Sequence, residues 1–139
     1  MRIAVDFDGT IVEHAYPAIG HPIPFAIDVL KKLQEEEHHQ IVLWSVREGK
    51  LLDEAVAYCR QRGLEFYAVN QNNPDKTDAP EPRKLVADLF IDDRNLGGLP
   101  DWGVIYRMIK FHQTWQQAMT DNPELHKKEE KSFFKKLFG

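Results

Sequence analysis

The stretch IAVDFDGT, residues 3–10, decides how the rest of the chain is interpreted. Its first part, Ile3–Val5, is short, apolar and partly β-branched, and two carboxylates follow at once, Asp6 and Asp8, with Gly9 after them. An apolar run that ends on Asp and Gly predicts a buried strand that stops at Asp6 or just after it. Two like charges so close to the end of a buried strand then need a chemical explanation.

Beyond this strand the chain alternates between the periods of strands and helices. Further strands are predicted at 40–45, 64–70, 87–93 and 103–106, and helical patterns start at Pro24, at Arg47 and at Met108. The alternation predicts an α/β fold, a three-layer doubly wound parallel sheet with helices on both faces. Residues 11–23 hold two prolines and a glycine without a helical period, which predicts a loop or a small hairpin flap.

Composition narrows the class of protein. A chain of 139 residues fits one domain, for which we expect a core over 1–120 and a charged amphipathic tail over 121–139. The tail docks on its own domain, joins a homo-oligomer or touches an anionic surface, and packing against its own or a sister chain is preferred. The net charge of −4 gives no reason to expect nucleic acid or an anionic membrane as a partner. With one cysteine, no secretory leader and no apolar run long enough to span a bilayer, the expectation is a cytoplasmic protein.

Carboxylates meet at one edge of the predicted sheet. Right-handed crossovers place the C-terminal ends of all parallel strands on that edge, where ligands bind. Asp6, Asp8, Asp92 and Asp93 therefore converge and repel one another unless a cation joins them. Magnesium suits such oxygen donors and is commonly held by one or two carboxylates together with a substrate phosphate. The sequence thus predicts a magnesium site with these four residues as ligands.

The two carboxylates of the first loop suit different chemical roles. Asp6 ends the strand and is the better nucleophile, since carboxylates form covalent phosphoryl intermediates. Asp8 faces the same side two residues on, where it serves as general acid and then as general base. Gly9 and Thr10 allow the backbone to turn closely around a phosphate. Arg47, at the start of a predicted helix, either clamps a second phosphate or carboxylate or pairs on the surface with Glu48 or Asp93.

The run Asp6-Phe7-Asp8-Gly9-Thr10 resembles the first motif of the haloacid dehalogenase-like (HAD) phosphohydrolases. Other positions are similar in order: Ser45 to the second motif, which binds the phosphoryl oxygens; Lys84 to the third, which balances charge; and Asp92-Asp93 to the fourth, the acidic pair of the magnesium site. The resemblance implies a Rossmann-like HAD core, a flap after the first motif and a magnesium ligand from the Asp8 backbone carbonyl. Arg83 and Lys76 remain alternatives to Lys84.

The segments between the motifs are too short for a cap domain, so the resemblance is to a small, capless member. The predicted function is a magnesium-dependent phosphomonoester hydrolase with an aspartyl-phosphate intermediate on Asp6 and a phosphorylated substrate that the sequence does not identify. The alternatives are a phosphotransferase on the same site and a non-catalytic phosphate- or metal-binding protein. A dehalogenase has no use for Asp8, and a phospho-receiver switch carries its acidic pair and its phosphorylated Asp in the reverse order.

Overall fold

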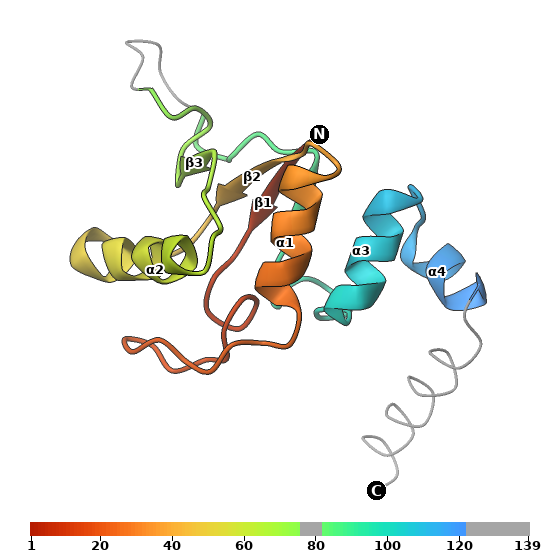
Figure 1. Cartoon of the computed structure of the whole chain (residues 1–139), viewed down its shortest axis with the longest axis horizontal. Helices are drawn as coiled ribbons and strands as arrows, with labels where there is room; N and C mark the ends of the chain where they lie inside the picture. Colours follow the sequence, from red (N-terminus) through yellow and green to blue (C-terminus); the bar gives the residue numbers. More distant parts are fainter. Residues whose placement is uncertain (76–81, 122–139) are drawn as a thin grey trace, which may run out of the picture. The chain divides into compact units, whose positions relative to one another are not determined.

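The computed structural model describes residues 1–75 and 82–121. Its elements, labelled in Figure 1, are β1 (Arg2–Val5), α1 (Ala26–Glu35), β2 (Gln40–Leu43), α2 (Gly49–Gln61), β3 (Ala68–Val69), β4 (Leu89–Ile91), α3 (Trp102–Lys110) and α4 (Trp115–Asp121). By its contacts the chain divides into a unit over Met1–Trp102 and a second unit from Gly103 onward. Residues 122–139 of the predicted tail lie outside the described residues.

One four-stranded sheet forms the centre of the first unit. The strand order is β3-β2-β1-β4 and every neighbouring pair is parallel. Ala4 lies opposite Val42 on one side and Phe90 on the other, so β1 is a central strand. This all-parallel sheet flanked by helices confirms the predicted Rossmann-like α/β fold. The strand order reverses between β1 and β4, and ligands of such sheets bind outside the carboxyl ends of the strands at this switch point.

The two faces of the sheet are covered differently. Helix α1 lies against β2 and buries the residues that recur at helical spacing on one side of it, which are Ala26, Val29, Leu30 and Leu33. On another face Ala4, Val42 and Ala68 pack with Leu85, which comes from the loop between β3 and β4. Within the described part of that loop there is no helix. The three-layer arrangement with helices on both faces therefore stays a prediction.

The predicted strands are shorter in the structure, and one of them is a helix. Strand β3 holds two residues instead of seven, although hydrogen bonds from Tyr67 N to Ile41 O and from Asn70 N to Leu43 O extend its pairing at both ends. The strand predicted at 103–106 was wrong, because these residues lie in α3. Buried residues of α3 recur three and four positions apart, at Trp102, Ile105 and Ile109, which is a helical period.

The single helix predicted from Met108 onward was also wrong, because the structure has two helices there, α3 and α4, separated by residues 111–114. Thr114 and Gln117 form a capping box at the start of α4. Gln117 N donates to Thr114 Oγ1 over 3.2 Å, and Thr114 N donates to Gln117 Oε1 over 2.8 Å. The Thr-x-x-Gln sequence that marks this new helix start was readable from the sequence.

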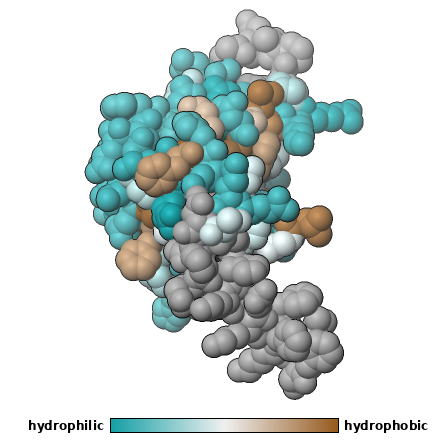
Figure 2. All heavy atoms as spheres, turned by 90° about the vertical axis from the view of Figure 1, so that its right-hand side faces the viewer, coloured by the Kyte–Doolittle hydropathy of each residue, from teal (hydrophilic) through white to brown (hydrophobic). Residues whose placement is uncertain are grey.

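Residues 11–23 form the predicted flap. Val12 pairs with Pro22 in an antiparallel bridge, and Glu13 N donates to His21 O over 2.8 Å. We use the term flap for residues 13–21, which these contacts close into a narrow loop. None of the described helices has the length and apolar character needed to cross a membrane. On the face drawn in Figure 2 the described residues are mostly hydrophilic, with hydrophobic side chains scattered among them.

Candidate active site

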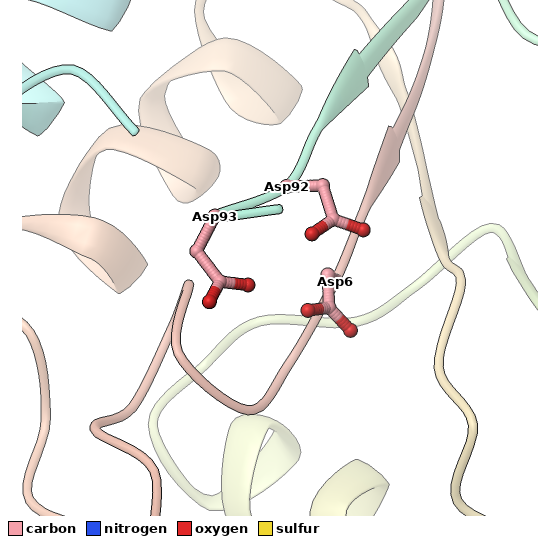
Figure 3. Close-up of side chains that lie close together, drawn as sticks. All are labelled: Asp6, Asp92 and Asp93. Atoms are coloured by element: carbon pink, nitrogen blue, oxygen red, sulfur yellow. The ribbon is translucent and has the colours of Figure 1, made fainter. Parts of the chain in front are cut away.

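An acidic cluster lies at the switch point of the sheet. Asp6 follows β1 directly, and Asp92 and Asp93 follow β4, the neighbouring strand. One carboxylate oxygen from each residue lies within 4.8 Å of the others, and Figure 3 shows the three side chains facing a common space. A hydrogen bond of 3.0 Å from Asp6 N to Ile91 O continues the pairing of β1 and β4 past the strand ends. The sheet itself therefore fixes where Asp6 stands.

The cluster makes ionisation of the Asp6 carboxyl group less favourable. Burial is the largest cause that raises the pKa of Asp6, and the negative charges of Asp92 and Asp93 and a hydrogen bond with Asp93 raise it further. The backbone N–H of Phe7 acts in the opposite direction, and the net result is a pKa of about 7 in place of 3.8. Three hard oxygen donors that repel one another suit a divalent cation such as Mg²⁺, which prefers oxygen ligands. The residues present therefore fit a magnesium ion.

Asp93 is anchored to the first loop from two sides. Thr10 Oγ1 donates to Asp93 Oδ1 over 3.3 Å and accepts from Asp93 N over 3.1 Å. From the flap, His14 Nε2 lies 2.9 Å from Asp93 Oδ2. Burial raises the pKa of Asp93, but the hydrogen bond and charge of His14, with hydrogen bonds from Asp92 and Asp6, outweigh burial and leave the pKa below its ordinary value. His14 is thus part of the site, and the sequence did not indicate that it pairs with Asp93.

Gly9 and Thr10 shape the loop instead of offering free donors to a phosphate. Gly9 N donates to Val12 O over 2.7 Å, and Thr10 N donates to Phe7 O over 3.2 Å. Gly9 has φ +82°, and a Cβ there would overlap the His14 ring and the Asp93 carboxylate, so another residue at this turn would be strained and would displace these two side chains. The Thr10 side chain is fully buried and occupied by Asp93. The Thr10 hydroxyl therefore serves Asp93, and the turn of the Gly9–Thr10 backbone around a phosphate stays a prediction.

Trp102 contacts the loop that contains Gly9 and Thr10. Its indole is 1% exposed, and its Nε1–H donates to the Thr10 carbonyl over 3.0 Å. A buried carbonyl needs such a partner, because an unsatisfied polar group in the interior is costly. Trp102 therefore supports the acidic cluster through Thr10, a role that the sequence did not indicate.

Asp8 is held apart from the acidic cluster by Arg47. Arg47 Nε donates to Asp8 Oδ2 and Arg47 Nη2 donates to Asp8 Oδ1, each over 2.7 Å. The remaining N–H groups of Arg47 donate to the carbonyls of Pro17, Ala18 and Leu51 over 3.2, 2.8 and 3.4 Å. A guanidinium has five N–H donors, and all five are engaged. Asp8 keeps its backbone carbonyl as the group that the HAD resemblance assigns to the metal.

The phosphate contact expected of Arg47 has to be corrected. Its side chain is fully buried and has no donor left for a phosphate, and its partner is neither Glu48 nor Asp93 but Asp8. The pairing with Asp8 is the largest cause that raises the pKa of Arg47, while burial opposes it. A buried bidentate pair of this kind is a structural contact with strict geometry.

Ser45 lies on the same edge of the sheet, two residues after β2. Its N–H donates to Asn70 Oδ1 over 2.8 Å, and Asn70 Nδ2 donates back to the Ser45 carbonyl over 2.9 Å. The Ser45 hydroxyl accepts a hydrogen bond of 3.1 Å from Arg47 N. Asn70 has φ +54°, a conformation that Asn tolerates better than most residues. Asn70 therefore fixes the Ser45 loop, and an asparagine at the end of the strand predicted at 64–70 was its only sequence signal.

Lys84 forms no ion pair with the acidic cluster within the described part of the chain. It is exposed, and its Nζ lies 5.5 Å from the centre of the Phe90 ring. Among residues 1–75 and 82–121, no ion pair joins Lys84 to Asp6. Arg83 is exposed as well, and Lys76 lies outside the described residues. The charge-balancing lysine stays a prediction.

The fold and the site define a Rossmann-like α/β protein with three carboxylates at the switch point of a parallel sheet. No family model matches the sequence, and no curated protein matches it. Among solved structures, a conserved protein from Bacteroides thetaiotaomicron is 63% identical to this chain, with a TM-score of 0.80 over 84% of this chain and 95% of that chain. At this identity and coverage, the chain belongs to the same family as that conserved protein.

Proposed function

We propose that this protein is a magnesium-dependent phosphomonoester hydrolase of the HAD type that works through Asp6. The observation that carries the proposal is the convergence of Asp6, Asp92 and Asp93 within 4.8 Å at the carboxyl ends of two adjacent parallel strands. Ser45 follows β2, the strand on the other side of β1. These residues are the ones that resemble three of the HAD motifs. A capless, three-layer HAD core is part of the same proposal.

The cation would be held by the carboxylates of Asp6, Asp92 and Asp93 and by the Asp8 carbonyl. When bound, it would neutralise their charge and that of the substrate phosphoryl group, which is what phosphoryl transfer requires of a metal. Neutralisation would also return Asp6, whose pKa lies at about 7 without a cation, to the ionised form that attacks.

The chemical steps fall to the carboxylates of the first loop. An oxygen of Asp6 forms a bond to phosphorus, and the ester P–O bond breaks to release the alcohol of the substrate. Water then attacks phosphorus in the aspartyl phosphate, which releases inorganic phosphate and restores Asp6. Asp8 is assigned the proton transfers, first to the leaving oxygen and then from the attacking water. The Ser45 hydroxyl, which accepts from Arg47 N and keeps its own O–H to donate, is assigned the phosphoryl oxygens.

A second candidate is a metal- or phosphate-binding protein without turnover. It is favoured by two observations: Arg47 engages both Asp8 oxygens, and among the described residues Lys84 forms no ion pair with the cluster. Such a protein would bind Mg²⁺ at the cluster and leave phosphate esters intact. A phosphotransferase would differ from the hydrolase only in passing the phosphoryl group to an added alcohol.

The deciding experiment is phosphate release from p-nitrophenyl phosphate and a panel of natural phosphate esters, with Mg²⁺ and with chelator. We compare the parent protein, Asp6→Asn, and the control Asp53→Asn, which makes the same substitution at an exposed position of α2. Turnover that needs Mg²⁺, is lost in Asp6→Asn and persists in Asp53→Asn supports the hydrolase. Mg²⁺ binding without turnover of any ester supports the second candidate, and turnover that survives Asp6→Asn contradicts the proposed mechanism.

A further inference from the structure

Arg47 joins parts of the chain that the acidic cluster does not. Two of its hydrogen bonds, each of 2.7 Å, go to Asp8, and two more go to the flap carbonyls of Pro17 and Ala18. The Asp8 carboxylate, for its part, has hydrogen bonds only with Arg47 among the described residues. Asp8 and the flap are therefore linked through a single side chain.

Aromatic rings complete the surroundings of this guanidinium. The Arg47 Cζ atom lies 5.1 Å from the centre of the Phe7 ring and 5.2 Å from that of Tyr16, a flap residue. At its other contact the flap reaches the acidic cluster, where His14 lies 2.9 Å from Asp93. The flap is thus attached to the site at two points, Asp93 directly and Asp8 through Arg47.

Because Arg47 is buried, it depends on both of its groups of partners, Asp8 and the flap. Arg47 is fully buried, and a charged group inside a protein must be both neutralised and hydrogen-bonded. Asp8 supplies the charge, and the flap supplies two of the carbonyls. If either partner moves, the guanidinium keeps its charge and loses its compensation, which is strongly unfavourable. The position of the flap and the orientation of Asp8 should therefore change together.

We propose that Arg47 is a positioning residue that holds the Asp8 carboxylate and the flap as one unit. Through Arg47 the flap orients the residue to which proton transfer is assigned, while Arg47 itself does not bind the phosphate. The assignment to turnover rests on the proposed function; the coupling between Asp8 and the flap does not.

The coupling is tested without turnover, by amide NMR and hydrogen exchange of the flap. We compare the parent with Asp8→Asn, Arg47→Lys and the control Arg60→Lys, which alters an exposed Arg–Glu contact. Both site variants should shift the amide signals of Ala18 and its neighbours and speed their exchange about tenfold or more, and the control should not. Because Asp8 reaches the flap through Arg47, flap signals that keep their parent positions and rates in Asp8→Asn would overturn the coupling.

The role in turnover is tested by separating rate from phosphate affinity. Arg47→Lys should lower kcat about 100-fold, the scale of lost acid–base catalysis. The inhibition constant of inorganic phosphate should stay within about threefold of the parent, because in this proposal Arg47 does not contact the bound phosphate. The reverse pattern, an unchanged kcat with weaker phosphate inhibition, would make Arg47 a phosphate ligand and overturn the proposal. If the parent itself hydrolyses no ester, the proposed function fails, and flap exchange still decides the coupling.

Discussion

Replacing Asp6 with asparagine should stabilise the protein in the absence of metal and remove its stabilisation by Mg²⁺. The carboxylate of Asp6 is raised to a pKa of about 7 from 3.8, chiefly by burial and then by Asp92 and Asp93. Between these two values the folded state binds more protons than the unfolded state, so the contribution of Asp6 to stability falls as pH rises from about 4 to about 7. Above pH 7 the full cost of the charge is present.

The magnitude follows from the size of the shift. One pKa unit corresponds to about 1.4 kcal/mol, so a shift of roughly three units sets a ceiling of about 4 kcal/mol at pH 8 and about 1 kcal/mol at pH 4.5. The cluster is only partly buried, and solvent and salt screen it, so we expect a measured gain of about 1–2 kcal/mol for Asp6→Asn at pH 8. Asparagine keeps an oxygen that accepts from Phe7 N–H, which limits other losses.

The assay is urea unfolding with chelator at pH 4.5 and pH 8, for the parent, Asp6→Asn and the control Asp53→Asn. The gain of Asp6→Asn should be larger at pH 8 than at pH 4.5, and the control should stay within about 0.5 kcal/mol. With Mg²⁺ at ten times its dissociation constant, the parent should gain about 1.4 kcal/mol and Asp6→Asn much less. If Asp6→Asn is less stable than the parent at pH 8 without metal, the repulsion inferred for the cluster is absent.

Two further substitutions test the support of the first loop. Gly9→Ala should cost more than the roughly 1 kcal/mol expected of Gly97→Ala, because both glycines have positive φ but only at Gly9 would the new methyl group overlap other atoms; equal losses in urea unfolding would argue against the overlap. Trp102→Phe should lose about 2 kcal/mol, since it removes the hydrogen bond to the Thr10 carbonyl and leaves a cavity. The exposed Trp115→Phe should lose less than about 0.5 kcal/mol, and similar losses for both would show that the Trp102 bond contributes nothing.

The position of the acidic cluster was predictable because it depends on topology. A strand that ends on Asp6 and another that ends on Asp92 need only be parallel neighbours in one sheet to bring their carboxylates together. The structure makes β1 and β4 such neighbours. Apolar runs that end on Asp identify these two strands, and an apolar run also identifies β3, although its predicted length is too great.

The partner of Arg47 was not predictable, because it depends on three segments at once. Sequence position placed Arg47 before a helix and suggested an anion or a neighbouring carboxylate. Asp8 lies 39 residues away, and the flap carbonyls that complete the site have no side-chain signature. Periodicity fails in another way at 103–106, since four apolar residues fit a strand or a helix equally well.

The carboxylates of this site fall into two groups: Asp8 has a cationic partner in the chain, and the acidic cluster has no lysine or arginine partner among the described residues. The difference bears on the role of a metal ion. Asp8 receives a buried guanidinium from the chain itself. Asp6 and Asp92 pair with no lysine or arginine within residues 1–75 and 82–121, and Asp93 has only His14. The chain supplies a fully hydrogen-bonded cation for one carboxylate and leaves Asp6, Asp92 and Asp93 facing one another. We therefore expect a divalent cation, which prefers oxygen ligands, to neutralise these three carboxylates when it binds.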